Sequence, residues 1–263
     1  MRAIITGAAS GIGRAVALRL ARDAFERDRR PAQLLLVDVA GDALVDVAAA
    51  LRAEDVQAEV FVGDLGDSAV PDQVVAAAHG YFGGVDVLIS NAGIISRASL
   101  LDLSVAEYER SFAINTRATW LLGRAAHPLL AAARGCIVAT ASLAAREPTP
   151  PLGAYSASKA ALVMLIQQMA CEWGPDGIRC NTVSPGSTHT AMTDARYSQP
   201  ELRAAAASRN PLRMVGEPGH QAAAIAFLAG PDAAYITGAD LVVDGGLQGM
   251  LMQASALGDP WRR

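Results

Sequence analysis

The stretch MRAIITGAASGIGRAVALRL, residues 1–20, passes from a short apolar run through a glycine-rich loop into a helix-favouring sequence. RAIIT has the branched apolar residues of a buried strand, whereas the residues after the loop are rich in alanine and leucine. Glycines let a dinucleotide pyrophosphate approach the backbone, and the first N–H groups of a helix can bind it. A glycine-rich loop by itself also fits a plain turn, so the flanking strand and helix carry the prediction of a nucleotide-binding α/β fold.

Further apolar runs follow at intervals, separated by alanine-rich helical stretches. They are LLLVD, AEVFVGD, VDVLISN, GCIVATAS, IRCNTVSP and DLVVDGG, which with RAIIT make seven expected strands. Strands that alternate with helices form right-handed crossovers into a parallel sheet covered on both faces. We therefore predict one domain over residues 1–263, a doubly wound, Rossmann-type, seven-stranded parallel sheet. The segment from about 190 to 217 interrupts the even spacing, and we interpret it as a lid over the ligand.

The composition indicates a small-molecule partner. The chain of 263 residues has 18% charged residues and a formal charge of -4, so no basic field would attract nucleic acid or an anionic membrane. Three cysteines without CxxC spacing and four histidines without HExxH spacing predict no metal site. The N-terminus has neither signal-peptide nor membrane-span character, so we expect a cytoplasmic protein with reduced thiols.

Tyr155 and Lys159 stand four positions apart in YSASKAAL, a run that favours helix, so they lie on one face one turn apart. A phenol loses its proton near pH ~10, and an adjacent ammonium would lower this pKa, which would make Tyr155 a general acid or base. The alternative is an incidental polar pair on an amphipathic helix.

Asp38 ends the second expected strand, in LLLVDVA. A carboxylate there can accept hydrogen bonds from an adenosine ribose and repels a 2'-phosphate, which favours NAD over NADP. The alternative is that Asp38 caps the helix that follows.

These stretches together resemble the short-chain dehydrogenase/reductase family over nearly the whole chain. The motifs are TGxxxGxG at 6–13, GDL at 63–65, NAG at 91–93, IN ending at Asn115, Ser142, YxxxK at 155–159, SPG at 184–186 and VDGG at 243–246. Each motif is modest, and the order together with the thirteen-residue spacing from Ser142 to Tyr155 makes the match specific. The resemblance implies a nicotinamide-dependent oxidoreductase, a dehydrogenase or reductase that acts on CH–OH or CH–CH groups.

The resemblance also implies catalytic roles. Tyr155 would exchange a proton with the substrate oxygen, Lys159 would lower the phenol pKa and bind the nicotinamide ribose, and Ser142 would orient the substrate oxygen. Asn115 would shape a water-linked proton path to the lysine. Ser142 could instead be a plain strand-ending serine, and Asn115 a polar residue that distorts its helix.

Cofactor contacts implied by the resemblance begin at the glycine loop and end near the expected lid. Asp64 and Leu65 would border the adenine, Asn91 would pin the loop, and Thr190 would contact the carboxamide or phosphates. The full set is Gly7, Ser10, Gly11, Ile12, Gly13, Asp38, Asp64, Leu65, Asn91, Ala92, Gly93, Tyr155, Lys159, Pro185, Gly186, Thr188 and Thr190.

Two stretches, 142–162 and 178–192, are similar to 2,3-dihydro-2,3-dihydroxybenzoate dehydrogenases, which aromatise a cyclic dihydrodiol acid in siderophore synthesis. Arg97, Arg146 and His189 are then candidate substrate residues, because arginine pairs with carboxylates. The same arginines also fit a solvated surface. Aromatisation favours the oxidative direction.

The alternatives are a 3-oxoacyl or general secondary-alcohol/ketone reductase and a non-catalytic nucleotide-sensing protein. Family members commonly pair long helices, so we expect a homotetramer or homodimer.

Overall fold

The computed structural model describes residues 1–28 and 30–250. Its sheet has seven parallel strands in the order β3-β2-β1-β4-β5-β6-β7. The strands are β1 (Arg2–Thr6), β2 (Gln33–Asp38), β3 (Gln57–Val62), β4 (Val87–Ser90), β5 (Cys136–Thr140), β6 (Arg179–Pro185) and β7 (Asp240–Val243). The order reverses on the two sides of β1, which is the point where doubly wound sheets bind ligands. The prediction of seven parallel strands is confirmed.

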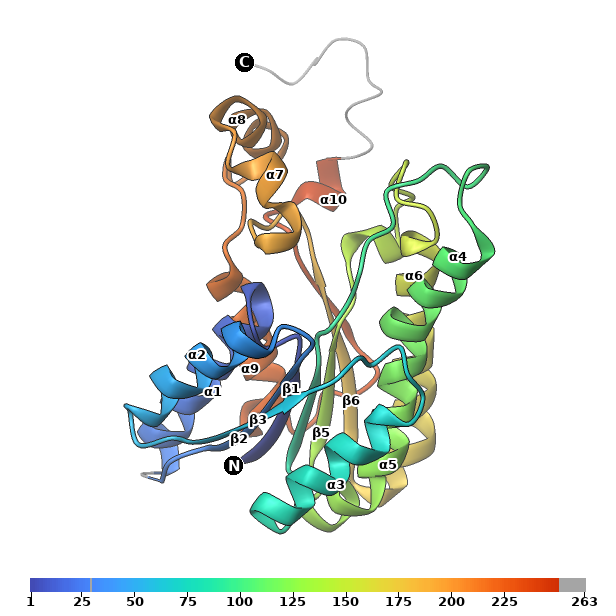
Figure 1. Ribbon diagram of the computed structural model, residues 1–263. Coiled ribbons are helices and arrows are strands. Elements are labelled where there is room, and N and C mark those ends of the chain that lie inside the picture. The colour runs from blue at the N-terminus through green and yellow to red at the C-terminus, as the bar shows by residue number, and fades with distance from the viewer. Residues whose placement is uncertain (29, 251–263) are drawn as a thin grey trace.

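Helices cover both faces of the sheet (Figure 1). One face carries α1 (Gly11–Asp28), α2 (Gly41–Arg52) and α9 (Pro218–Ala229), and the other carries α3 (Val70–Phe82), α5 (Ala118–Ala133) and α6 (Tyr155–Trp173). Each face has its own apolar core, because the strand side chains alternate between the two sides. Ile5, Leu34 and Leu36 pack under α1 and α9, while Ile4, Leu35 and Leu88 pack under α3 and α5.

The shorter elements lie mainly around the carboxyl edge of the sheet. They are α4 (Val105–Phe112), the π-helical turn η1 (Ala113–Arg117), the 3-10 turns η2 (Leu143–Ala145), η3 (Gly174–Asp176), η4 (Ala191–Thr193) and η5 (Pro231–Ala233), and the helices α7 (Asp194–Tyr197), α8 (Pro200–Arg209) and α10 (Leu247–Met250). In Figure 1 the orange segment with α7 and α8 stands above this edge, opposite the green loop that leads into α4. Within the described ranges, no helix is long and apolar enough to cross a membrane.

Candidate active site

A cavity of about 780 Å³ lies at the carboxyl ends of the strands. Most residues expected to hold a nucleotide or to catalyse line it. These are Gly7, Ser10, Gly11, Ile12, Asp38, Asp64, Leu65, Asn91, Ala92, Gly93, Ser142, Tyr155, Lys159, Pro185, Gly186, Thr188 and Thr190. The cavity therefore brings the glycine loop, the ends of five strands and the start of α6 into one space.

The backbone of the glycine loop packs closely against itself, which leaves the space on its cavity side free for a ligand. Gly7 has a φ of 66°, in the left-handed region that favours glycine. A Cβ on Gly13 would lie 2.0 Å from the carbonyl oxygen of Gly7, so Gly13 does not line the cavity but sits directly behind the loop. Helix α1 begins at Gly11, and Gly11 and Ile12 of its first turn line the cavity, where the free N–H groups of a helix start can bind an anion.

Asn91 joins the loop to two strands. Its amide nitrogen donates to the carbonyl oxygens of Thr6 and Gly7 at 3.1 and 3.3 Å, and its side-chain oxygen accepts from the Thr140 hydroxyl at 3.0 Å. The Thr6 hydroxyl in turn accepts from the backbone N–H groups of Asn91 and Ala92. Asn91 therefore fixes the first residues of the glycine loop against β4 and β5.

Asp38 occupies the end of β2 beside the glycine loop. Its carboxylate accepts hydrogen bonds from the backbone N–H groups of Val39 and Ala40 at 2.8 and 3.1 Å, and from that of Ala9 at 3.1 Å. Helix α2 starts at Gly41, directly after the Ala40 N–H that Asp38 binds. The carboxylate therefore contacts both the backbone that leads into α2 and the glycine loop, and it also lines the cavity.

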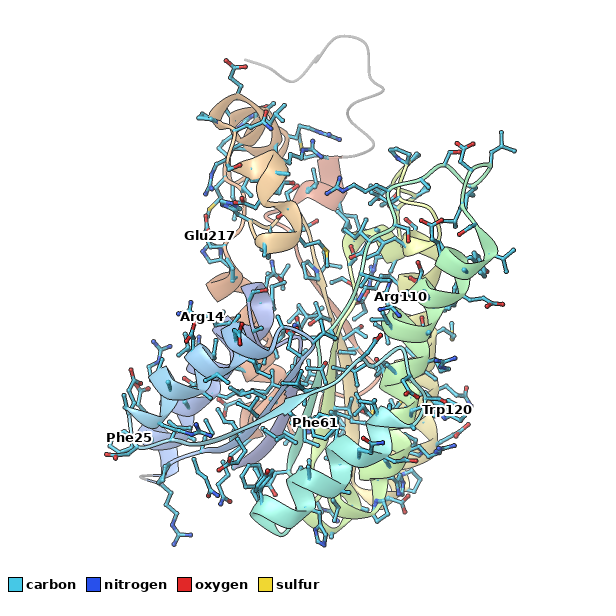
Figure 2. The ribbon with its side chains drawn as sticks, viewed as in Figure 1. Arg14, Phe25, Phe61, Arg110, Trp120 and Glu217 are labelled. Atoms are coloured by element: carbon cyan, nitrogen blue, oxygen red, sulfur yellow. The ribbon has the colours of Figure 1, made fainter. Side chains whose placement is uncertain are left out.

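Asp64 and Leu65 follow β3 and border the same end of the cavity. One oxygen of Asp64 accepts from the backbone N–H of Gly66 at 2.8 Å, and the other accepts from Arg110 at 3.0 Å. The Gly66 hydrogen bond, aided by the Arg110 guanidinium, lowers the pKa of Asp64. Figure 2 shows Arg110 projecting from α4 toward the middle of the molecule.

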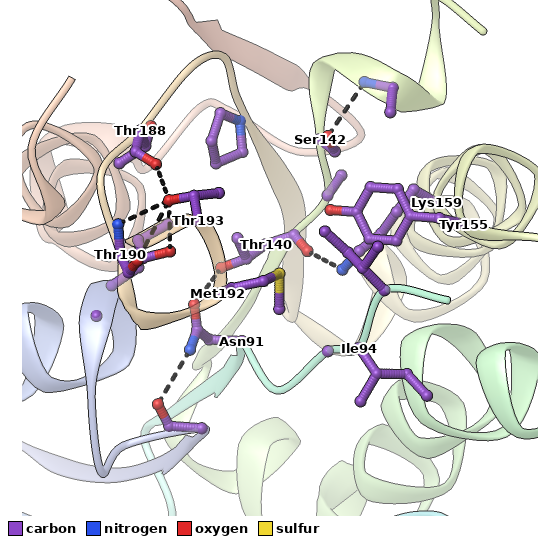
Figure 3. A pocket seen from close by; sticks show the side chains of 18 of the residues that line it. Asn91, Ile94, Thr140, Ser142, Tyr155, Lys159, Thr188, Thr190, Met192 and Thr193 are labelled. Carbon is purple, nitrogen blue, oxygen red and sulfur yellow. Dashed lines mark hydrogen bonds between the residues drawn. The ribbon is translucent and has the colours of Figure 1, made fainter. Parts of the chain in front are cut away.

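Lys159 is buried, and its ammonium donates a hydrogen bond of 2.7 Å to the carbonyl oxygen of Thr140 (Figure 3). Burial lowers the pKa of this amine from 10.5 to about 8. Its nitrogen lies 6.0 Å from the centroid of the Tyr155 ring, as the shared helix face predicts. Thr140 takes part through its backbone carbonyl, which the side-chain pattern of the sequence does not identify.

The pKa of Tyr155 is raised, whereas the sequence predicts that Lys159 lowers it. Burial raises the pKa of the phenol, and the nearby Ser142 hydroxyl acts in the opposite direction to a smaller extent. The physical reason is that the ammonium is directed to the Thr140 carbonyl and not to the phenol oxygen. The Ser142 oxygen accepts from the backbone N–H of Ala144 at 3.1 Å, which leaves its own hydrogen available as a donor.

Asn115 lies at the centre of the π-helical turn η1, behind the cavity and almost fully buried. Its side chain exchanges hydrogen bonds with the backbone of Ile94 at 2.8 and 3.0 Å and donates to the Ser158 hydroxyl at 3.0 Å. The helix is therefore distorted at Asn115. At the same place, the Asn115 side chain positions Ser158, the residue before Lys159. Such single π turns are frequent at functional sites.

Arg146 is not a substrate residue in this structure. It does not line the cavity, and its guanidinium binds Asp240 at 2.8 Å. Asp240 is only 3% exposed and also accepts from the hydroxyls of Thr182 and Ser184. The prediction for Arg146 is wrong because a buried carboxylate on β7, distant in sequence, attracts it.

His189 is likewise absent from the cavity lining. Its two ring nitrogens contact Asp194 at 2.9 Å and Arg203 at 2.7 Å, and Arg203 also pairs with Glu217. These contacts join both ends of the 190–217 segment, so the substrate prediction for His189 is wrong.

Arg97 does line the cavity, and its guanidinium reaches the backbone oxygen of Met192 at 3.4 Å. Arg196 and Arg209, on α7 and α8, line the same cavity but were not identified from the sequence. The only signal available for them was their position in the expected lid. Glu147, five residues after Ser142, is a further lining residue that the sequence analysis did not name.

Thr188 and Thr190 both line the cavity, and Thr190 lies beside the glycine loop. A Cβ added to Gly11 would be 3.3 Å from the Cβ of Thr190. Thr188 is buried and accepts from the side-chain amide of Gln221 at 3.1 Å. Across residues 1–28 and 30–250, no three histidine, cysteine or acidic side chains cluster so as to hold a metal ion.

Comparison with known proteins gives one consistent result. The family model described as enoyl-(acyl carrier protein) reductase matches residues 7–248. The chain belongs to the short-chain dehydrogenase/reductase family. As a member of that family it is an oxidoreductase acting on CH–OH groups with a nicotinamide dinucleotide, NAD or NADP.

Curated family members align along nearly the whole chain. The 2-(R)-hydroxypropyl-CoM dehydrogenase of Xanthobacter autotrophicus is 38% identical, over 92% of this chain and 96% of its own length. The 2,3-dihydro-2,3-dihydroxybenzoate dehydrogenase of Bacillus subtilis is 35% identical, over 93% and 94%. A short chain dehydrogenase from Burkholderia cenocepacia in complex with NADP has a TM-score of 0.84 and 34% identity, over 94% of this chain and 97% of that one.

Proposed function

We propose that this protein is an NAD-dependent dehydrogenase that removes a hydride from a secondary alcohol and a proton from its hydroxyl group. The observation that carries the proposal is that Ser142, Tyr155 and Lys159 line the same cavity as the glycine loop. The tight packing of Gly13 against Gly7 fits a nucleotide held by backbone N–H groups. When bound, the nicotinamide supplies the hydride acceptor.

The side chains of this site divide the remaining work. Tyr155 takes the hydroxyl proton, and the free hydrogen of Ser142 binds the same substrate oxygen and stabilises negative charge on it. Lys159 holds a positive charge in a buried position next to Tyr155 and binds the nicotinamide ribose. Asn115 positions the chain around Ser158 and Ile94, so that water reaches the lysine and carries the proton away.

The preference for NAD rests on Asp38. Its carboxylate lines the nucleotide end of the cavity and is held there by three backbone N–H groups. A fixed negative charge accepts hydrogen bonds from a ribose and repels the 2'-phosphate of NADP. Asp64 and Leu65 border the adenine in the same proposal, while Pro185, Gly186, Thr188 and Thr190 contact the nicotinamide half.

For the substrate we propose a cyclic dihydrodiol acid, such as 2,3-dihydro-2,3-dihydroxybenzoate, oxidised to an aromatic product in siderophore or secondary-metabolite synthesis. The sequence similarity of 142–162 and 178–192 and the 35% identical Bacillus subtilis enzyme support this choice. The purified protein should form NADH from NAD and this acid. Activity on 3-oxoacyl thioesters, with none on the dihydrodiol acid, would overturn the choice of substrate.

Tyr155→Phe tests the chemistry, because it removes the proton acceptor and keeps the ring. We expect turnover to fall by about 10²–10⁴-fold, the usual contribution of general acid–base catalysis, while NAD binding stays nearly unchanged. Tyr235→Phe is the matched control, since Tyr235 is fully exposed and does not line the cavity. Unchanged turnover in Tyr155→Phe would overturn the assigned role and indicate another proton acceptor, whereas no turnover in the unaltered protein would support the non-catalytic, nucleotide-sensing alternative.

One observation favours a second candidate, a secondary-alcohol/ketone reductase or 3-oxoacyl reductase. Burial raises the pKa of Tyr155, so at neutral pH the phenol carries the proton that reduction of a ketone requires. Under this candidate, ketone reduction with NADH is fast at neutral pH and falls as the phenol ionises. Under the first candidate, oxidation speeds up over the same pH range.

We also propose a homotetramer or homodimer, a cytoplasmic location and a lid formed by residues 190–217. The outer side chains of the α5 and α6 pair support the assembly, because Trp120 and Met164 are 41% and 63% exposed. Figure 2 shows Trp120 on the outside of the molecule. The three cysteines are free, which fits a reducing compartment. Sedimentation of Trp120→Arg tests the assembly. If the variant has the same mass as the unaltered protein, the α5 and α6 face does not form the subunit interface.

A further inference from the structure

Three arginines line the cavity, two from the 190–217 segment and one from the loop that contacts it. Arg97 lies in the loop between β4 and α4, Arg196 lies on α7, and Arg209 ends α8. The last two belong to the 190–217 segment, which stands opposite the loop of Arg97 in Figure 1. The 3.4 Å contact from Arg97 to the backbone oxygen of Met192 shows that the two sides approach each other.

These arginines differ from other arginines near the cavity, because those have carboxylate partners. Arg110 pairs with Asp64, Arg146 with Asp240, and Arg203 with Glu217. None of the acidic side chains in residues 1–28 and 30–250 forms an ion pair with Arg97, Arg196 or Arg209.

The acidic groups of the cavity leave an excess of positive charge at this end. Its lining contains Asp38 and Asp64, which lie at the nucleotide end, and Glu147, which lies on the loop after Ser142. Three lining arginines without an ion pair therefore accompany a single lining carboxylate, that of Glu147, outside the nucleotide end. Guanidinium groups bind carboxylates through paired, charge-assisted hydrogen bonds.

We propose that Arg196 and Arg209, assisted by Arg97, form an anion subsite that binds the carboxylate of an acidic substrate. The inference rests on the proposed function and assigns the substrate class of the same site. The apolar residues Ile94, Leu152 and Met192 line the same cavity and would contact the carbon skeleton. The hydroxyl that reacts then lies at Tyr155 while the anion is held at the 190–217 segment.

The test compares Arg196→Gln and Arg209→Gln with the control Arg213→Gln. Arg213 lies in the same segment and donates to the backbone oxygen of Ser208, but does not line the cavity, so the control makes the same change of charge. Binding of 2,3-dihydroxybenzoate and of neutral catechol to the protein with NADH would be measured by calorimetry. Benzoate and benzenesulfonate serve as further carboxylate and sulfonate probes.

We expect each cavity variant to weaken 2,3-dihydroxybenzoate binding by about 10–100-fold, the effect of losing a hydrogen bond to a charged group, with little change for catechol. Arg213→Gln should bind both like the unaltered protein. Equal loss for the acid and for catechol, or the same loss in Arg213→Gln, would overturn the anion subsite. Tighter binding of benzenesulfonate than of benzoate would overturn the choice of a carboxylate.

Turnover separates this inference from the proposed function. If the arginine variants lose affinity for the acid but the unaltered protein does not oxidise the dihydrodiol acid, the anion subsite stands and the proposed substrate fails. If the protein oxidises the acid and its uncharged cyclohexadiene diol equally well, before and after substitution, the proposed oxidation stands and the anion subsite fails.

Discussion

The ammonium nitrogen of Lys159 lies 2.7 Å from the carbonyl oxygen of Thr140, and the lysine is held by this bond in a buried position at the end of β5. A charged amine in such a place loses its hydration and regains a single protein hydrogen bond. The site therefore carries a cost to stability, as is common where a buried charge serves a function.

Lys159→Met should make this cost visible as a pH-dependent change in stability. The fall of the Lys159 pKa from 10.5 to about 8 corresponds to about 3 kcal/mol of destabilisation while the amine is charged in both states. Below pH 8 the variant should unfold at higher urea concentration than the unaltered protein, although the lost hydrogen bond subtracts about 1 kcal/mol.

The sign of the pH dependence follows from the lowered pKa. Between about pH 8 and 10.5 the unfolded chain holds the Lys159 proton and the folded chain does not, so the unaltered protein gains stability as the pH rises. The advantage of Lys159→Met should shrink over that range. A difference in unfolding free energy that is constant from pH 7 to 10 would contradict the buried charge.

Asp38→Ser should shift the nucleotide preference. Removing the carboxylate removes the repulsion of a 2'-phosphate, and we expect kcat/KM for NADP relative to NAD to rise by roughly tenfold or more. Asp42→Ser is the control, because Asp42 lies in the first turn of α2 and does not line the cavity. An unchanged ratio in Asp38→Ser would place the selectivity elsewhere.

Two glycine substitutions should have opposite effects. In Gly13→Ala the new Cβ would lie 2.0 Å from the Gly7 carbonyl oxygen, so the glycine loop must move. We expect a loss of about 1–3 kcal/mol in unfolding free energy and weaker nucleotide binding. Gly80→Ala, inside α3 with nothing within 4 Å of its Cβ, should instead gain about 0.5–1 kcal/mol. Both are measured by urea unfolding, and a stable, nucleotide-binding Gly13→Ala would refute the close packing.

The fold could be predicted from the sequence, and so could the residues whose position follows from the periodicity of their own helix or strand. The strands were predictable because most of them contain a short apolar run between helix-favouring stretches, although β6 (RCNTVSP) mixes polar and apolar residues. Tyr155 and Lys159 share a helix face, and Asp38 ends a strand at the edge where nucleotides bind. In these cases, secondary structure alone fixes which way the side chain points.

Residues whose partners come from distant segments were not predictable. Arg146 and His189 were assigned to a substrate from their loops, but Asp240 on β7 binds the first, and Asp194 and Arg203 bind the second. The direction of the shift in the Tyr155 pKa was not predictable for a similar reason, because the Lys159 ammonium donates its hydrogen bond to the Thr140 carbonyl. Arg196 and Arg209 reach the cavity only through the tertiary placement of α7 and α8.

Arg146→Met tests the corrected role of Arg146 against the substrate role. The change leaves the Asp240 carboxylate, 3% exposed, with only the hydroxyls of Thr182 and Ser184 as side-chain partners. Because Arg146 is itself 41% exposed, we expect a loss of about 1–3 kcal/mol in unfolding free energy, at the lower end of the cost of breaking a buried pair.

The double variant Arg146→Met with Asp240→Asn should recover part of this loss, since the uncompensated charge is gone. KM for acidic substrates should stay unchanged in both variants, in contrast to Arg196→Gln. A selective rise in KM without loss of stability would return Arg146 to the substrate site.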